Sequence, residues 1–168
     1  MKQDCVICGQ PLGFMKFKCR DGAVCKKCYR IVSQEYTQTI VDRDTSDLLA
    51  IFEKYKSQPD FDITRRINQY LLFDDPHQLI CLPNNRKYSD AKLPPEFFSY
   101  RSLKSCSLVQ DTIEIKGKVR KNLELKLSFD DSIERKIVLI KKPIEVNSSI
   151  YQSMNKVANQ IINNLAKI

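Results

Sequence analysis

The sequence predicts an α+β protein: a small cysteine-rich module, followed by a mainly antiparallel β domain that ends in a helix. Three observations predict this fold class. Two CxxC motifs lie within the first 28 residues. Apolar and polar residues then alternate in short runs separated by turn residues, which is typical of strands. Finally, residues 150–165 carry apolar side chains at helical spacing.

The paired motifs have the spacing of a four-cysteine metal site. Cys5 and Cys8 form the first pair, Cys25 and Cys28 form the second, and sixteen residues separate the pairs. We predict that these four thiolates bind one structural Zn²⁺, because a tetrahedral site of this kind leaves the metal no open position for chemistry. A redox pair would need a single CxxC beside a βαβ pattern, which the sequence lacks. Iron in the same four-cysteine site stays open as an alternative.

The residues around the two pairs predict a treble-clef zinc finger over residues 1–41. The expected elements are a knuckle with Gly9, a strand over Phe14–Lys18, a hairpin turn at Asp21-Gly22 and a helix from the second pair to Ile40. The positive end of that helix would favour thiolates. Cys19 points the same way as Phe17, so we expect it in the core of the finger and not on the metal.

A helix and a linker are predicted over residues 42–62. The cap residues of the cluster Asp42–Asp47 mark the start of the helix, and an apolar stripe follows them. The helix should end near Ser57, because Pro59 disfavours helical backbone in the residue before it. Gln58–Asp62 then reads as the linker.

Residues 63–168 are predicted to form a β domain with a C-terminal helix, in the element order of a pleckstrin-homology-like (PH-like) fold. The expected strands are Ile67–Phe73, Gln78–Leu82, an extended piece from Pro94 through Tyr100, Ser102–Gln110, Thr112–Lys116, Leu123–Phe129 and Ile133–Ile140. The expected turns are Asp74–His77, Asn84–Arg86 and Asp130–Ser132. Ser148 or Ser149 should cap the final helix, whose amide-rich polar face argues against a membrane-surface helix.

The composition favours an acidic partner. Lysine and arginine outnumber aspartate and glutamate by 28 to 20, which gives a formal net charge of +8 and a pI near 9.1. The N-terminus does not lead into an apolar segment typical of a signal peptide, and no apolar run is long enough to span a membrane. Seven cysteines without an export signal indicate reduced thiols. We therefore expect a cytoplasmic protein.

Two basic clusters are the candidate contact sites. The first lies on the predicted finger and consists of Lys16, Lys18, Arg20, Lys26 and Lys27. The second lies at a predicted turn of the β domain and consists of Lys116, Lys118, Arg120 and Lys121. An acidic face of another protein is the partner that we expect first.

Two other partners stay open. Phe14 and Phe17 stand between lysines and could stack on nucleic-acid bases, although both could instead fill the core of the finger, which we favour. The second basic cluster could bind anionic lipid at the tip of a hairpin. Membrane contact is the least expected of the three.

No feature of the sequence indicates catalysis. Four protein ligands would close the metal site, and the single histidine, His77, lies in a predicted turn. We find no nucleophile–base pair, phosphate-binding loop or second metal cluster. We therefore expect a non-enzymatic interaction protein, and the sequence does not predict its oligomeric state.

The N-terminal segment resembles an uncharacterised bacterial and phage family that has a CxxCG knuckle, a basic hairpin with a KDG-like turn and a second CxxC; here it reads CVICGQPLGFMKFKCRDGAVCKKC. The four cysteines match the metal positions of that family, and Arg20-Asp21-Gly22 matches its turn. Members often continue into a PH-like domain with an FSYxxL phrase, here Phe98–Leu103. The resemblance implies a zinc module and a PH-like domain in a bacterium or a phage-infected cell. It implies no activity.

The phage connection adds a narrower alternative. Small zinc-carrying phage proteins include inhibitors of bacterial defence, so a blocker of a Cas9-type nuclease (an anti-CRISPR protein) that acts by protein contact is a further possibility.

Overall fold

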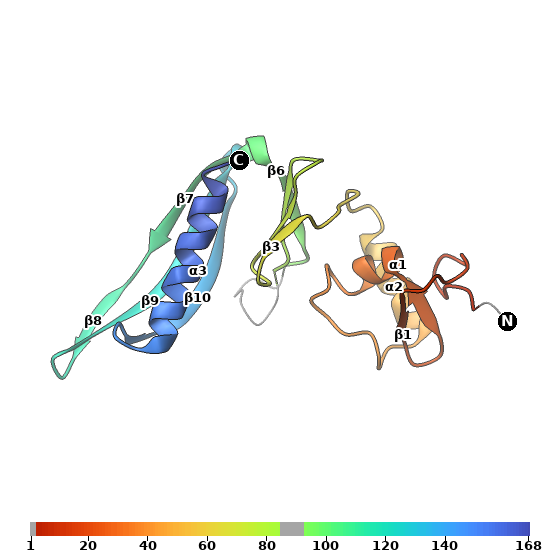
Figure 1. Ribbon diagram of the computed structural model, residues 1–168, viewed down its shortest axis with the longest axis horizontal. Helices are drawn as coiled ribbons and strands as arrows, with labels where there is room; N and C mark the ends of the chain where they lie inside the picture. The colour runs from red at the N-terminus through yellow and green to blue at the C-terminus, as the bar shows by residue number, and fades with distance from the viewer. Residues whose placement is uncertain (1–2, 85–92) are drawn as a thin grey trace. The chain divides into compact units, whose positions relative to one another are not determined.

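A computed structural model describes residues 3–84 and 93–168 (Figure 1). The chain forms two compact units, which we call unit 1 (Met1–Asp60) and unit 2 (Phe61–Ile168). Helices and antiparallel sheets occur together, which confirms the predicted α+β class. The predicted helix and linker of residues 42–62 do not stand apart, because almost all of them belong to unit 1.

Unit 1 has the elements expected around the cysteine pairs. They are β1 (Lys16–Lys18), β2 (Ala23–Cys25), α1 (Lys26–Val32) and α2 (Thr45–Tyr55). Strands β1 and β2 pair antiparallel, and α1 begins directly after β2. The predicted order of knuckle, hairpin and helix N-terminus is therefore confirmed.

Helix α1 is much shorter than predicted. It ends at Val32, because three consecutive residues from Gln34 to Tyr36 have positive φ angles of 50°, 57° and 62°. Left-handed backbone cannot continue a right-handed helix. Ile40 is nevertheless buried, with 1% of its surface exposed. The apolar spacing up to Ile40, from which the longer helix was predicted, therefore reflects buried positions and not helical structure.

Helix α2 completes the core of unit 1. Asp44 is its N-cap, and the Asp44 side chain accepts a hydrogen bond of 2.9 Å from the backbone N–H of Asp47. Leu48 is fully buried and packs in the same cluster as Val32 and Ile40. The predicted helix start is confirmed, and the helix shares a core with the cysteine module.

The hairpin turn of the finger is fastened to the start of α2. The Asp21 carboxylate accepts hydrogen bonds from the backbone N–H of Thr45 (3.0 and 3.1 Å) and from its hydroxyl (2.9 Å). The backbone N–H of Arg20 donates to the Arg43 carbonyl at 2.9 Å. The Thr45 N–H group holds the pKa of Asp21 below its usual value. These bonds join the β1–β2 turn to the first turn of α2.

We expect Asp21→Ala to lower the melting temperature of unit 1 by a few degrees at neutral pH, because Thr45 loses an ionised acceptor at a helix start. The folded-state pKa of Asp21 is depressed, so its contribution is present above the unfolded pKa and disappears as the pH falls through the folded pKa. Thermal unfolding of both proteins at neutral and acidic pH checks this, with Asp60→Ala as the control. A difference in melting temperature between wild type and D21A that is the same at low and at neutral pH would count against the ionic bond.

Unit 2 consists of two antiparallel four-stranded sheets and a helix. The first sheet has the order β3-β4-β5-β6, with strands Arg65–Ile67, Leu71–Asp74, Leu79–Leu82 and Glu96–Ser99. The second has the order β10-β9-β7 with β8 also on β9, and its strands β7 to β10 are Leu103–Val109, Thr112–Ile115, Lys118–Phe129 and Glu134–Glu145. Short 3-10 turns cover Tyr100–Ser102 and Asp130–Ser132, and α3 (Ser149–Leu165) follows. Strands followed by one helix is the order that the sequence predicts.

One predicted strand is wrong. The expected strand Ile67–Phe73 is a hairpin, in which β3 turns into β4 at Asn68, whose φ is 49°. The backbone N–H of Tyr70 closes this turn on the Ile67 carbonyl at 3.1 Å. Both strands of the hairpin carry buried apolar residues, which made the run look continuous. The predicted turn at Asn84–Arg86 falls largely outside the described residues.

The second sheet has one buried and one polar face. Leu123, Leu125 and Leu127 of β9 are fully buried, and α3 lies along this sheet (Figure 1). The residues between them point away from the core, where Glu124 and Lys126 pair with lysine and glutamate side chains of β10 at 3.3 and 2.7 Å. The alternation predicted for this strand is confirmed.

Ser148 caps α3, since its hydroxyl accepts a hydrogen bond of 3.2 Å from the Tyr151 N–H. Over the described part of the chain, none of the helices combines the length and apolar character that crossing a membrane requires.

Candidate metal centre and neighbouring surfaces

The four predicted metal ligands lie together in unit 1. The sulfur atoms of Cys5, Cys8, Cys25 and Cys28 are all within 4.8 Å of one another, and those of Cys8 and Cys25 are 3.8 Å apart. A tetrahedral ion with zinc–sulfur bonds of about 2.3 Å separates its ligand sulfurs by about 3.8 Å. All four cysteines are free of disulfides. The cluster therefore fits one tetrahedral metal ion.

The first pair is held by the knuckle. Gly9 has a φ of 67°, a left-handed conformation that glycine adopts without strain, and its N–H donates to the Cys5 carbonyl at 2.9 Å. The knuckle is joined to β2 by a hydrogen bond of 3.1 Å from the Val6 N–H to the Ala23 carbonyl. A side chain at Gly22 would clash with Val6, so the hairpin turn packs against the knuckle only with glycine there.

The second pair is held by the junction of β2 and α1. Cys25 is both the last residue of β2 and the N-cap of α1, and its sulfur accepts a bond of 3.5 Å from the Cys28 N–H. The Cys25 N–H in turn lies 3.4 Å from the Cys5 sulfur. Backbone N–H groups thus point at the sulfurs, which favours thiolates.

The metal-free thiols differ in acidity. Burial opposes ionisation of Cys5, but backbone N–H groups of Cys8, Cys25 and Ile7 outweigh it and lower its pKa to about 7. Burial raises the pKa of Cys28, and the neighbouring thiols Cys25 and Cys8 raise it further. Burial also raises the pKa of Cys8. The metal-free cluster therefore keeps protons at neutral pH.

We expect zinc affinity to rise with pH, because an incoming ion must displace the protons of Cys8 and Cys28. Each proton released makes the apparent affinity increase about tenfold per pH unit, so release of at least the Cys8 and Cys28 protons gives about a hundredfold or more near neutrality. Competition against a chromophoric chelator from about pH 6.5 to about pH 8, with proton release followed in weak buffer, measures this. An affinity that stays constant over that range would show that the ligands are already ionised.

Cys19 does not join the cluster. It is buried, with 8% of its surface exposed, and packs in the core of unit 1 with Val24. Its sulfur lies 3.7 Å from an oxygen of Asp21. The structure therefore places this thiol beside the hairpin turn, where the sequence predicts a core residue.

The first basic cluster separates into two parts. Arg20 is engaged within unit 1, since its guanidinium donates to the Asp42 carbonyl and lies 3.8 Å from an oxygen of Asp44. The lysines Lys16, Lys18, Lys26 and Lys27 are exposed, and none of their side chains forms a hydrogen bond or ion pair with the residues that the structure describes.

The two aromatic residues near these lysines behave differently. Phe17 stacks on Tyr29, with ring centroids 3.8 Å apart and an interplanar angle of 2°. Phe14 is completely exposed, at 106% of its reference surface, and Met15 is 56% exposed. The favoured expectation that both phenylalanines fill the core is therefore correct for Phe17 and wrong for Phe14.

Two residues of the second basic cluster share one acidic partner. Lys118 and Arg120 both contact Glu145, at 3.1 and 3.4 Å. Lys116 lies in the turn between β8 and β9, and Lys121 is half-buried on β9. Two of the four cations are thus ion-paired, and all four lie on the hairpin of β8 and β9.

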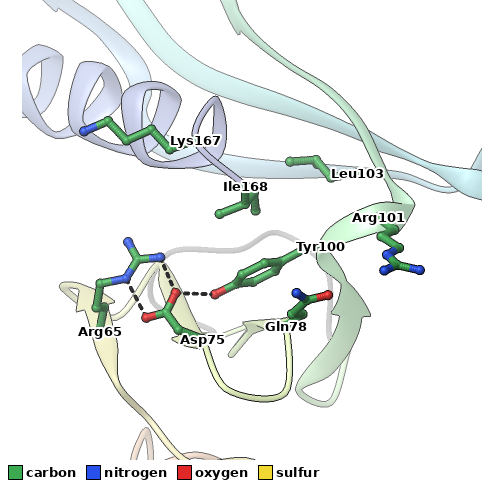
Figure 2. Close-up of a pocket in the computed structure, with 8 residues that line it drawn as sticks. All are labelled: Arg65, Asp75, Gln78, Tyr100, Arg101, Leu103, Lys167 and Ile168. Carbon is green, nitrogen blue, oxygen red and sulfur yellow. Dashed lines mark hydrogen bonds and ion pairs between the residues drawn. The ribbon is translucent and has the colours of Figure 1, made fainter.

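Unit 2 contains a pocket that the sequence did not predict (Figure 2). Its volume is about 680 Å³, and it is lined by Arg65, Asp75, Gln78, Tyr100, Arg101, Leu103, Lys167 and Ile168. Arg65 donates two hydrogen bonds to Asp75, at 2.8 and 2.7 Å, and the Tyr100 hydroxyl donates a third at 2.8 Å.

Three polar groups of this pocket, those of Arg65, Asp75 and Tyr100, bond to one another. Hydrogen bonds from Arg65 hold the pKa of Asp75 well below its usual range. Burial, together with Asp75, raises the pKa of Tyr100 to about 12. The network joins β3, the turn after β4 and the 3-10 turn before β7. The adjacent aspartates Asp74 and Asp75, which close a buried strand, were the one sign of this pocket in the sequence.

His77 lies beside a buried carboxylate. Its ring Nδ1 is 2.6 Å from Asp74, whose side chain is fully buried and also accepts a bond of 2.8 Å from the Asp62 N–H. The His77 side chain itself is 51% exposed. Asp74 thus fixes the turn that the sequence predicts at this histidine.

Residues 3–51 match a protein family described as a domain of unknown function (DUF4428). The matched segment contains all four clustered cysteines, the β1–β2 hairpin, α1 and the first part of α2. No curated protein and no solved structure matches the chain. The matched family thus covers most of unit 1 and none of unit 2.

Proposed function

We propose that this protein is a non-enzymatic, zinc-stabilised interaction protein that binds another protein through surfaces of its two units. The observation that carries the proposal is the cluster of four cysteine sulfurs within 4.8 Å of one another. Four thiolates complete the tetrahedral coordination that Zn²⁺ adopts in structural sites, so no position is left for water or substrate. Zinc in such a site acts on folding and not on a reaction.

The core of unit 1 supports this role for the metal. Cys5 and Cys28 are themselves among its buried residues, beside apolar side chains such as Val24, Ile40 and Leu48. A unit of this size buries too little apolar surface to be stable without an added restraint. Zinc would supply that restraint by joining the knuckle to the start of α1.

Charge supports a partner with an acidic face. The chain carries a formal net charge of +8, and Lys16, Lys18, Lys26 and Lys27 are exposed without a partner in the described residues. Basic surfaces of this kind speed association with acidic proteins. In unit 2, Arg101 and Lys167 line the pocket and add positive charge at a concave surface.

Two measurements test the proposal. Metal analysis of the purified chain should find one zinc ion per molecule, and iron or no metal would contradict the assignment. Affinity purification from the cells that encode the chain should then retain a protein through nuclease treatment with wild type and lose it with Cys25→Ser. Cys106→Ser is the matched control, because this half-buried thiol lies in unit 2. If no protein remains after nuclease treatment, the proposed protein partner is wrong.

A further inference from the structure

The loop before β1 holds two neighbouring apolar side chains in solvent. Phe14 is 106% exposed and Met15 is 56% exposed, and neither belongs to the core cluster of unit 1. Single exposed apolar residues are common on protein surfaces. Here an aromatic residue and a methionine are adjacent and exposed, although unit 1 has an apolar core that contains Val24, Ile40 and Leu48. Their exposure therefore requires an explanation.

Four lysines surround these two residues in the chain and in the hairpin. Lys16 and Lys18 follow them on β1, and the β1–β2 register places Lys16 opposite Cys25. Lys26 and Lys27 come directly after Cys25. The pairing of the strands thus brings Lys16, Lys26 and Lys27 to the end of the hairpin that carries the apolar loop. Lys18 lies two residues further along β1, opposite Ala23, and on the same face of the strand as Lys16.

The charge of these lysines is only partly offset nearby. A zinc ion with four thiolates carries a formal charge of 2−, which leaves two of the four positive charges uncompensated. Of the acidic side chains closest in sequence, Glu35 pairs with Arg30, and Asp21 is balanced by the adjacent Arg20, which leaves the exposed Asp4 as one further negative charge. This end of unit 1 therefore stays positive when the metal is bound.

We propose that this surface, which we call the lysine–phenylalanine tip (Phe14, Met15, Lys16, Lys18, Lys26 and Lys27), docks on an anionic lipid membrane. Apolar side chains that project from a protein can enter the boundary between headgroups and acyl chains. Lysines beside them are attracted by the negative potential of anionic lipids. The proposal goes beyond the protein partner above, with which lipid would compete for the same four lysines, and it needs only that unit 1 is folded.

The tip fits a lipid surface better than it fits nucleic acid. Binding to single strands uses several aromatic faces in a row, on which successive bases stack. Only Phe14 offers a free face here, because the ring of Phe17 is occupied by Tyr29. Met15 has no aromatic ring but is well suited to an apolar phase. To bury Phe14 and Met15, a protein partner would need a matching apolar pocket, whereas a membrane needs none.

Vesicle sedimentation with the zinc-loaded chain of 168 residues tests the proposal. We expect binding to vesicles that mix phosphatidylcholine with phosphatidylglycerol, weak binding to phosphatidylcholine alone, and a steep loss of binding at high salt. Phe14→Ser should weaken binding about tenfold, because it removes the largest inserting side chain. Val41→Ser is the matched control, since Val41 is also exposed (59%) in unit 1 but lies outside the tip.

A second pair of variants tests the charges. Lys16→Gln with Lys18→Gln should weaken binding to anionic vesicles about tenfold or more. Lys54→Gln with Lys56→Gln removes the same charge from α2 and its C-cap and should leave binding nearly unchanged. Zinc content is measured for every variant, so that loss of the fold is recognised. Equal effects of the two double variants would show that net charge alone, and not the tip, attracts the protein.

A fluorescence measurement decides whether the tip enters the lipid. The chain contains no tryptophan, so Phe14→Trp introduces a single reporter. The emission of this variant should shift to the blue on anionic vesicles and be quenched by brominated lipids. Emission that stays unchanged when the variant sediments with vesicles overturns the proposal. Quenching by single-stranded DNA or RNA in preference to lipid overturns it as well, and would assign the tip to nucleic acid.

Discussion

Cys25→Ser abolishes stoichiometric zinc binding and unfolds unit 1, while unit 2 keeps its structure; this is the largest effect that we expect from a single substitution. Cys25 supplies a ligand, ends β2 and caps α1 with its sulfur. Structural zinc contributes on the order of 10 kcal/mol to folding in comparable small modules. That exceeds the stability of a unit of this size, so the loss of the ion leaves α1 and the hairpin without support.

Metal analysis together with two-dimensional NMR measures this outcome. Amide signals of residues 3–60 should collapse to unfolded positions, and those of unit 2 should persist, because its largest core cluster contains residues 67–165 only. Cys19→Ser is the matched control: the same substitution at a buried thiol outside the cluster should keep zinc and cost about 1–2 kcal/mol. Equal zinc loss in both variants would show that the ligand set is wrong.

Arg30→Met is the second large effect, with an expected loss of about 3 kcal/mol in the stability of unit 1. The Arg30 guanidinium donates a bond of 2.8 Å to Glu35, and their side chains are only 10% and 0% exposed. The second carboxylate oxygen of Glu35 has no partner in the described residues. Without the arginine, a fully buried carboxylate would face no positive charge.

The pH gives this prediction a direction. Burial raises the pKa of Glu35 to about 7, although Arg30 acts in the opposite direction. The folded state therefore binds a proton more tightly than the unfolded state, and the contribution of this group to stability declines as the pH rises from about 4.5 through 7. Without Arg30 the pKa of Glu35 should rise further, so ionisation of Glu35 destabilises the variant more than the wild type. The stability lost on Arg30→Met should therefore be larger at pH 8 than at pH 6.

Chemical unfolding of unit 1 at these two pH values, with zinc content confirmed, measures the effect. Arg30→Met combined with Glu35→Gln should recover part of the stability, because the buried charge is gone. If the single and the double variant lose the same stability at both pH values, packing and not charge explains the role of Arg30.

The metal cluster could be predicted because its signal is local. Two CxxC pairs with Gly9 and the Asp21-Gly22 turn between them define a knuckle and a hairpin without knowledge of distant contacts. The buried face of β9 was predictable for the same reason, since strict alternation of leucines with charged residues has one structural meaning.

Other features depend on contacts that no local pattern reports. The end of α1 at Val32 coincides with three left-handed residues, and the Arg30–Glu35 pair and a bond from the Tyr36 N–H to the Ser33 hydroxyl lie in this segment. The pocket network joins Asp75 to Arg65 and Tyr100, which lie 10 and 25 residues away in the chain. The exposure of Phe14 also escaped prediction, because aromatic spacing does not distinguish a core residue from a surface one.

The bonds between Asp21 and Thr45, together with the core that α2 shares with the cysteine module, should couple metal occupancy to the order of α2. We expect the hairpin that carries the turn to depend on the ion that joins the knuckle to α1, and α2 begins on that turn. Loss of zinc should therefore melt both helices, the 7 residues of α1 and the 11 of α2. By thermodynamic reciprocity, any molecule that binds folded α2 should raise the affinity of unit 1 for zinc. Helix α2 contains none of the four metal ligands. Its contribution to the far-ultraviolet circular dichroism should nevertheless report how much metal is bound.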